Sequence, residues 1–249
     1  MYRLMGSLIM AALLCLSVTQ TAQAEDSPNK FGIQLGGGYG IYDMGDVELG
    51  VDYLLQNVDG GVATREDGGI MGNLALIYRP GKHQIWEIGY NPLFDVENLV
   101  EFKSGDSAAT GQLLMHANEF YAKAGVTTDL AKRLQLALGL GVAYYNCEMQ
   151  IQDEFNGRFY YDAVGRAFGL IGTVGLELGL SKRVGLFLTG GGRWANAANF
   201  SYESSPGNRT SVPVLGGTRA MEVNLSGGFA QAGFRFYFDP LTKPVDFTR

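Results

Sequence analysis

Large apolar residues alternate with small or polar residues from Phe168 to Trp194. The apolar set is Phe168, Leu170, Val174, Leu176, Leu178 and Leu180, and after Ser181-Lys182-Arg183 it continues with Val184, Leu186, Leu188 and Trp194. A period of two residues is the period of a β-strand, so this stretch predicts a hairpin with one apolar face. A membrane-spanning helix of about 20 residues is disfavoured, because Glu177 would lie near its middle.

Eight segments of the chain show this alternation. They span residues 30–41, 70–79, 83–94, 110–126, 134–145, 168–180, 184–194 and 221–238. Short and long connections alternate between them, and the long ones far exceed the roughly 2 to 5 residues of an ordinary hairpin loop. All short turns, and both ends of the predicted sheet, therefore fall on the same side.

Residues 1–24 have the features of a cleaved signal peptide. Arg3 supplies the positive start, residues 8–18 the apolar core and Ala22-Gln23-Ala24 the cleavage site, so the mature chain is expected to begin at Glu25. Cys147 is then the one remaining cysteine, and an internal disulfide is not available to an exported fold of this kind.

The composition agrees with an exported, strand-rich protein. Charged residues make up 18% of the chain, and glycine contributes 36 of its 249 residues, about twice the usual share. No stretch after the signal peptide approaches about 18 uninterrupted apolar residues, so no transmembrane helix is expected. The net charge of −6 gives no reason to propose nucleic acid as a partner.

Two architectures fit the alternation: a membrane barrel with its apolar face outward, and a soluble barrel or sandwich with its apolar face inward. The second face is mostly Gly, Ala, Thr and Ser with a few isolated charges, which is unlike a solvated face. Small side chains suit a narrow lumen, and eight strands give an interior just wide enough for side chains to fill. The predicted strands also exceed the roughly 5–6 residues of most soluble strands. The pattern therefore favours the membrane barrel.

The apolar residues change phase in two of the predicted strands. Leu113 and Met115 are odd-numbered while Phe120 is even-numbered, and a similar change separates Met221 from Ala230. A β-bulge would shift the phase in this way. Alternatively, these portions project beyond the lipid, where the facing of a side chain matters less.

The closing stretch, Ala230-Gln231-Ala232-Gly233-Phe234-Arg235-Phe236-Tyr237-Phe238, and the layout of the whole mature chain resemble the OmpA-, OmpX- and OmpW-like outer-membrane barrels of Gram-negative bacteria. The resemblance implies an all-β fold, an eight-stranded antiparallel up-and-down transmembrane β-barrel with short periplasmic turns and long extracellular loops. It implies outer-membrane lipid and lipopolysaccharide as surroundings, and recognition of Phe234, Phe236 and Phe238 by the barrel-assembly machinery during insertion.

The expected division of the chain is a signal peptide over residues 1–24, the barrel over 25–238 and a short periplasmic tail over 239–249. The tail departs from the family, in which the final Phe usually ends the chain. It is far too short for a peptidoglycan-binding domain.

Parity places six charged residues on the inner face of the predicted barrel: Glu87, Glu119, Lys123, Glu177, Arg193 and Arg235. Four of them, Glu87, Lys123, Glu177 and Arg235, fall at a similar depth from the short turns. Since a buried charge is costly unless it is paired, we predict a salt-bridged layer across the lumen. Such a layer would act as a plug that fixes the register of the barrel, or as a gate in a narrow ion path.

A helix is expected in the first long connection. Asp46 is a suitable N-cap and Gly60-Gly61 a suitable stop. One apolar stripe lies between them, formed by Val47, Val51, Leu54, Leu55 and Val58. The helix would be a lid on the mouth, a site for a partner or an apolar ligand, or a segment packed on the outer strands.

The sequence offers no support for catalysis, a cofactor or a metal site. The two histidines, His83 and His116, are not part of a known nucleophile motif, and the acidic loop residues do not match an EF-hand. The predicted role is therefore structural or interactive at the cell surface, with an unknown extracellular partner. A narrow porin-like channel, or a carrier of small hydrophobic molecules, is the alternative.

Overall fold

The structure is a computed structural model that describes residues 30–57, 61–104, 107–153, 159–181, 183–214 and 219–238. The predicted signal peptide and C-terminal tail lie outside these ranges, and so does Val58 of the predicted helical stripe. Within the described ranges, no helix is both long enough and apolar enough to cross a membrane.

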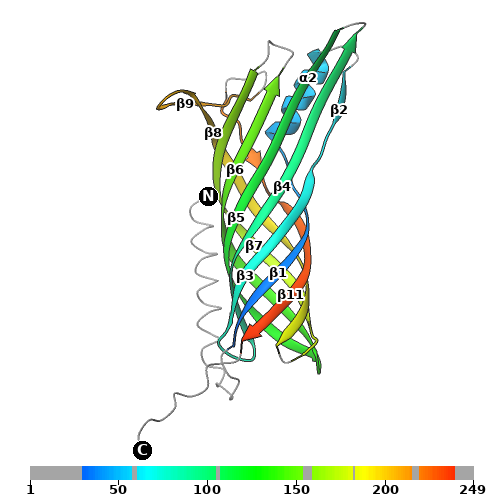
Figure 1. The fold of residues 1–249 in the computed structure, drawn as a ribbon, viewed down its shortest axis with the longest axis vertical. Helices are drawn as coiled ribbons and strands as arrows, with labels where there is room; N and C mark the ends of the chain where they lie inside the picture. Colours follow the sequence, from blue (N-terminus) through cyan, green and yellow to red (C-terminus); the bar gives the residue numbers. More distant parts are fainter. Residues whose placement is uncertain are drawn as a thin grey trace, which may run out of the picture.

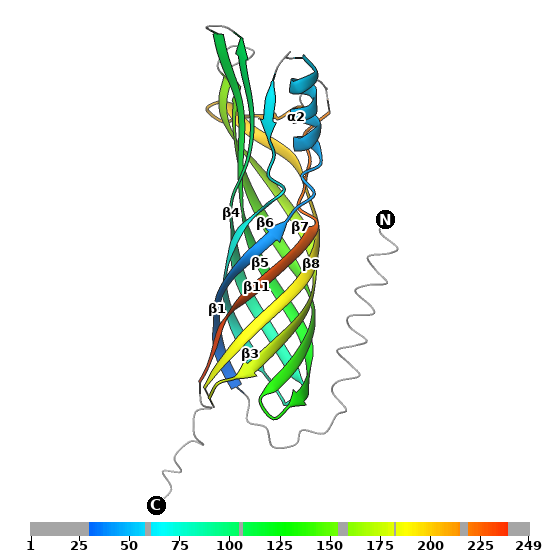
Figure 2. The ribbon, with the colours of Figure 1, turned by 90° about the vertical axis from the view of Figure 1, so that its right-hand side faces the viewer.

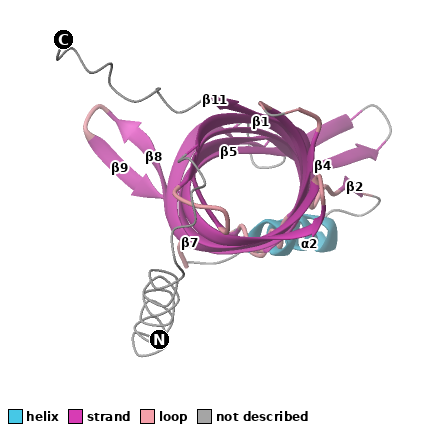
Figure 3. Ribbon diagram, turned by 90° about the horizontal axis from the view of Figure 1, so that it is seen from below, coloured by secondary structure: helices cyan, strands magenta, loops and turns pink. Residues whose placement is uncertain are grey.

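Eight long antiparallel strands form the body of the described chain. They are β1 (Lys30–Ile41), β3 (Gly68–Arg79), β4 (Gln84–Ser104), β5 (Ser107–Ala131), β6 (Leu134–Asp153), β7 (Phe159–Gly179), β8 (Val184–Ser205) and β11 (Gly227–Phe238). Each pairs with its neighbours in the chain, β11 pairs with both β8 and β1, and β7 pairs with β8. The sheet therefore closes into the up-and-down ring seen end-on in Figure 3.

The two ends of the barrel differ. At the short-turn end, brief turns follow Arg79, Ala131 and Gly179, and the first strand starts opposite the end of the last one (Figure 1). The long-loop end carries the helix α2 (Asp46–Asn57), seen in Figure 2, and three short strands, β2 (Val62–Thr64), β9 (Asn208–Ser211) and β10 (Val223–Asn224). The strands β2 and β9 are labelled in Figure 1.

The strands extend further toward the long-loop end than the alternation predicted. The pairing of β4 with β5 runs to Ser104 and Ser107, and the pairing of β6 with β7 runs to Asp153 and Phe159. Residues that we expected to form two of the long loops are thus mostly strand. The apolar alternation fades there because the outer face of these upper portions becomes polar, while the backbone ladder continues.

A bulge in β5, one of the two explanations offered for its phase change, is not present at that point. Odd-numbered residues point inward along the whole strand, from Met115 and Ala117 through Glu119 to Thr127. The register shift between β4 and β5 lies at Leu93 and Val96, where β4 holds the extra residue. Leu113 and Met115 are apolar because the upper part of the lumen is apolar. The same holds near the end of the chain, where Met221, Val223 and Leu225 are buried although the residues between β10 and β11 interrupt the strand.

A second extra residue lies in β8. The register with β7 shifts between Val164 and Arg166, and Asn199 has a φ of 61°. Asparagine enters this left-handed region more readily than most residues. The extra residue reverses the alternation, so that Phe200 turns into the barrel and is fully buried.

The outer surface of the barrel is apolar. On β6, Leu138, Leu140 and Val142 are 50%, 65% and 58% exposed, whereas their inward neighbour Ala143 is buried. The same arrangement recurs on the other long strands. The apolar stripe therefore faces outward from a closed ring, as the sequence predicted for a membrane barrel.

Candidate functional site in the barrel lumen

Five charged side chains meet inside the barrel near the short-turn end, and we call them the charged layer: Arg79, Glu87, Lys123, Glu177 and Arg235. Continuous ion pairs join them in the order Arg79–Glu177–Arg235–Glu87–Lys123. They come from β3, β4, β5, β7 and β11, so the layer spans the cross-section of the barrel.

Arg235 lies at the centre of the charged layer. Its Nη1 donates to Glu177 Oε2 at 2.7 Å, and its Nη2 donates to Glu87 Oε1 at 2.9 Å. Its Nε donates to Gln34 Oε1 at 2.7 Å. The guanidinium also lies over the Phe187 ring, 5.2 Å from the centroid. One side chain from β11 thus ties together β1, β4 and β7.

Each carboxylate of the layer contacts two cations. Glu87 and Lys123 are cross-strand partners, and Lys123 Nζ lies 2.8 Å from Glu87 Oε2 in an ion pair that lacks the alignment of a hydrogen bond. Glu177 accepts from Arg79 Nη2 at 2.5 Å and from the Tyr237 hydroxyl at 2.8 Å. The buried charges are therefore paired.

A second ion pair lies deeper in the lumen. Arg193 Nη1 is 3.2 Å from Glu119 Oε2, and both side chains are buried. The Arg193 guanidinium lies over the Phe229 ring at 4.7 Å and the Tyr42 ring at 5.3 Å, where a cation meets the negative face of each ring.

Amide side chains link the two levels. Gln34 Nε2 donates to Asn73 Oδ1 at 2.6 Å, Asn73 Nδ2 to Asn91 Oδ1 at 2.7 Å, and Asn91 Nδ2 to Glu119 Oε1 at 2.5 Å. Because Gln34 also accepts a hydrogen bond from Arg235 Nε, one hydrogen-bonded chain runs from the charged layer to the Glu119–Arg193 pair. The structure thus joins all six predicted lumen charges through a single polar network.

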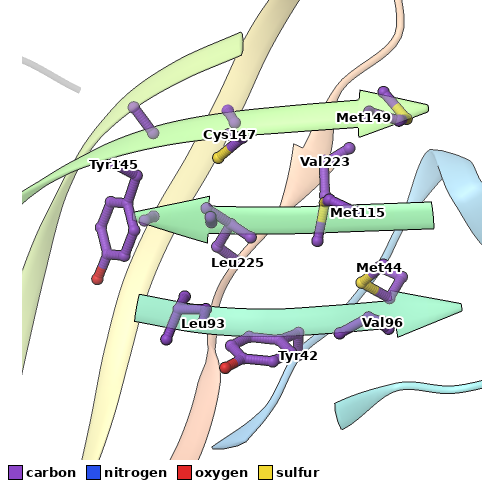
Figure 4. Packing of buried hydrophobic residues seen from close by; sticks show 14 of the residues in the cluster. Tyr42, Met44, Leu93, Val96, Met115, Tyr145, Cys147, Met149, Val223 and Leu225 are labelled. Atoms are coloured by element: carbon purple, nitrogen blue, oxygen red, sulfur yellow. The ribbon is translucent and has the colours of Figure 1, made fainter. Parts of the chain in front are cut away.

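Above this network the lumen becomes apolar. The upper apolar cluster contains Met115 and Met149, which are direct cross-strand partners, together with Cys147 (Figure 4). It also contains residues from the connections at the mouth, namely Tyr42, Met44, Val212, Val214, Met221, Val223 and Leu225. The first and last long connections therefore fold over the mouth and pack on inward-facing strand residues.

Asp46, in the first of these connections, accepts hydrogen bonds from two residues of the last one. Its Oδ1 accepts from Arg219 Nη2 at 2.5 Å, and its Oδ2 accepts from the Glu222 backbone N–H at 2.8 Å. The hydrogen bond from Arg219 to Asp46, together with the negative charge of Asp46, raises the pKa of Arg219 above its ordinary value. Asp46 was predicted to cap the helix, but both of its oxygens engage the last connection instead.

The helix α2 packs by its apolar stripe. Val47 and Val51 are buried, and Leu55 packs against Val51 and Val100 of β4. The Leu54 side chain and Val58 lie outside the described residues. The helix thus packs on β4 through Val51 and Leu55 and on the upper apolar cluster through Val47. Its role as a lid or as a site for a partner or an apolar ligand stays a prediction.

Sequence reasoning missed Arg79, Gln34, Asn73, Asn91 and Tyr237. Parity alone would have found them, because each lies an even number of residues from other inward-facing residues of its own strand. Arg79 was overlooked because it ends its strand, and the amides because only charges were considered. Phe234, Phe236 and Phe238 point outward and are exposed, and their recognition by an assembly machinery remains a prediction.

The two histidines have simple surroundings. His83 Nδ1 contacts the Thr127 carbonyl at 3.1 Å in a turn, and His116 lies 3.2 Å from Glu148. Among the described residues, no group of three or more His, Cys, Asp or Glu side chains is placed to hold a metal ion.

No family model matches this chain, and no curated protein matches it. The solved structures to which this chain is similar include three outer-membrane or surface proteins. OprG, an outer membrane protein from Pseudomonas aeruginosa, is 14% identical over 87% of this chain and 99% of its own, with a TM-score of 0.49. Neisserial surface protein A is 12% identical over 85% and 100%, with a TM-score of 0.40. A major outer membrane protein from Thermus thermophilus is 14% identical over 85% and 100%, with a TM-score of 0.45.

Proposed function

We propose that this chain is an integral outer-membrane protein whose barrel serves a structural or surface-interaction role. The observation that carries this proposal is the orientation of the barrel wall, with apolar side chains outward and charged side chains inward. A soluble barrel of this size would expose large apolar residues such as Ile88, Leu76 and Leu188 to water over its whole circumference. A lipid environment removes that cost.

Rows of outward-facing aromatic residues support the same placement. Tyr90, Phe120, Tyr144 and Phe168 are successive cross-strand partners from β4 to β7. Nearer the short-turn end, Trp86, Tyr78, Phe31 and Phe238 form a second such row. Aromatic side chains favour the boundary between hydrocarbon and water, and outer-membrane barrels carry girdles of them at both interfaces.

The polar network and the upper apolar cluster support a barrel that does not conduct. Ion pairs cross the lumen at two depths, and the mouth is packed with apolar side chains from two connections. The role at the surface then belongs to the elements at the long-loop end. Those elements would be extracellular, with the short turns and both termini in the periplasm.

The two tryptophans of the chain provide a direct test. Trp86 and Trp194 both point outward and are exposed. In vesicles of brominated phospholipid, we expect strong quenching of their fluorescence and little quenching by aqueous iodide. Quenching by iodide alone, together with recovery of the protein from the periplasmic fraction, would contradict the membrane placement.

A carrier of small hydrophobic molecules is the second candidate, because the upper lumen is apolar and includes five methionines: Met44, Met71, Met115, Met149 and Met221. Methionine side chains adapt readily to different apolar guests. Planar-bilayer recording and uptake of an apolar fluorophore separate the candidates. The structural role predicts near-zero conductance and no uptake into vesicles, whereas a carrier predicts saturable uptake.

A further inference from the structure

The charged layer does not balance its own charge. It holds three cations, Arg79, Lys123 and Arg235, and two carboxylates, Glu87 and Glu177. The side chains of all five are at most 11% exposed. The layer therefore carries one excess positive charge in a place with little access to water, which is costly unless a negative charge lies beside it.

The other nearby carboxylates of the described chain are already engaged. Glu119 pairs with Arg193 at the deeper level. Asp129 lies at the short-turn end, half exposed, with Lys82 Nζ 3.3 Å from its Oδ2. Neither side chain touches a cation of the charged layer directly. The link from Asp129 to Arg79 runs through Gln135, which accepts from Arg79 Nη1 at 2.7 Å and donates to Asp129 Oδ1 at 2.8 Å, so the five charges of the layer itself still sum to +1.

A small cavity adjoins the excess cations. Its polar lining is Lys123, Arg235, Glu87, Thr173 and Thr189, and the rest of the wall is formed by three glycines and by Ile85, Ala137 and Leu138. The cavity has room for about one water-sized guest. Both oxygens of Glu87 face cations, Arg235 on one side and Lys123 on the other, so its charge is compensated.

Two of these glycines keep this cavity open. A Cβ on Gly139 would lie 2.7 Å from Thr173 Oγ1, and a Cβ on Gly175 would lie 2.7 Å from Thr189 Oγ1. Larger residues would therefore displace the two hydroxyls from the cavity wall. The wall as it stands combines two cations with two hydroxyl groups, and these are donors for an anion. The Thr173 hydroxyl would turn to the anion from the Gly139 carbonyl, to which it makes a long hydrogen bond of 3.5 Å.

We propose that a small monovalent anion of the halide class, such as chloride, binds in this cavity beside Lys123 and Arg235. It neutralises the excess charge of the layer and accepts hydrogen bonds from the threonine hydroxyls. The size of the cavity excludes large organic anions. The proposal concerns the lumen and does not depend on the role of the loops.

The test is urea unfolding of the full-length mature barrel in a nonionic detergent, with potassium chloride or potassium gluconate at equal ionic strength. Equal ionic strength keeps general screening the same. Because an anion that binds the folded state alone stabilises it, chloride at 100 times its Kd lowers the unfolding equilibrium constant about 100-fold. We expect a saturable rise of the urea midpoint in chloride and none in gluconate.

Three variants sharpen the test. Lys123→Gln brings the formal charge of the layer to zero, so the midpoint should no longer respond to chloride. Gly175→Ala keeps the charge but narrows the cavity, and should weaken the response. Lys82→Gln removes an exposed cation outside the lumen and should respond as the wild type does.

Crystals grown in bromide give a measurement that needs no variant. Anomalous density beside Lys123 and Arg235 in the wild-type barrel, together with the chloride response, would support the site even if Lys123→Gln failed to fold. A midpoint that is equal in chloride and gluconate, with no bromide density in the cavity, would overturn the proposal and leave a water molecule as the occupant.

Discussion

Glu177 on β7 accepts a hydrogen bond from Arg79 on β3, the strand diametrically opposite in the ring of eight, with 2.5 Å between Oε2 and Nη2. Contacts between neighbouring strands fix the register of a barrel, but a contact across the lumen also fixes its cross-section. Arg235 adds a second tie to Glu177 from β11 at 2.7 Å. Glu177 is therefore the carboxylate on which the charged layer depends most.

Replacing Glu177 by Gln should destabilise the barrel strongly. The amide keeps the size of the side chain but leaves Arg79 and Arg235 without their shared partner, and breaking a buried ion pair on one side costs about 3–5 kcal/mol. Urea unfolding in detergent measures the loss. Glu203→Gln on the exposed β8–β9 hairpin is the matched control, and equal midpoints for the two variants would contradict this account.

The stability of the barrel should also be sensitive to the size of the side chain at a pair of glycines that faces Phe187. Gly36 and Gly233 are cross-strand partners, and a Cβ on Gly36 would lie 2.6 Å from the Ala232 carbonyl oxygen and 2.7 Å from Phe187 Cζ. We expect Gly36→Ala to cost about 1–3 kcal/mol through overpacking, measured by the same urea unfolding.

The control for this effect is Gly172→Ala on the outer face, where the nearest atom to a Cβ is Leu140 Cδ2 at 3.6 Å. It should leave the midpoint nearly unchanged. Adding Phe187→Leu to Gly36→Ala should restore part of the stability, because the smaller side chain makes room for the methyl group. No difference between the two alanine variants would show that the inner face is not tightly packed.

An arginine on the outer face of the barrel should destabilise it at the level of the hydrocarbon but not above the aromatic row. Leu140 and Gln150 both point outward from β6, on either side of the aromatic residue Tyr144. If the aromatic row marks the membrane boundary, Leu140→Arg should cost about 2–4 kcal/mol in folding into lipid vesicles, while Gln150→Arg should cost little. Equal effects would argue against a hydrocarbon band at the level of Leu140.

The wall of the barrel was predictable from the sequence, and the upper lumen was not. Alternation is a local property of the chain, so β1 was predicted with its true bounds, and the inward parity of Glu87 and Lys123 followed from it. Polarity, however, was read as the mark of the inner face. Where Met115 and Leu113 face inward, this rule made the apolar residues appear to change phase, and a bulge was one of two explanations offered, although odd-numbered residues face inward from Leu113 to Thr127.

The contacts across the lumen depend on the register between distant strands, which a single sequence does not specify. Parity placed Glu119 and Arg193 inside but could not pair them across the barrel. The role of Asp46 was missed for the same reason. Its position before an apolar stripe is typical of a helix cap, whereas its partner Arg219 lies 173 residues further along the chain.

Loosening the contact between the first and last connections should expose the upper apolar cluster. Cys147 is fully buried there, so we expect its thiol to react with maleimide only when the mouth opens. Asp46→Asn removes the ion pair with Arg219, and each kcal/mol lost speeds labelling about fivefold. Asp52→Asn, which breaks an exposed pair with Arg65, is the control. Equal labelling rates in both variants would mean that the mouth opens elsewhere.

The short-turn end should respond to acid through Asp129. Gln135 Nε2 donates to Asp129 Oδ1 at 2.8 Å, and this hydrogen bond, with help from Lys82, lowers the pKa of Asp129 below its ordinary value. A depressed folded-state pKa means that the carboxylate stabilises the fold above the unfolded value of about 3.9 and loses that contribution as the pH falls through the folded pKa. The wild type should therefore exceed Asp129→Asn in urea midpoint by a constant, small amount above about pH 5, and the difference should vanish on further acidification. A difference that grows toward low pH would mean that Asp129 is protonated more easily in the folded barrel than in the unfolded chain, which is the opposite of what its contacts with Gln135 and Lys82 require.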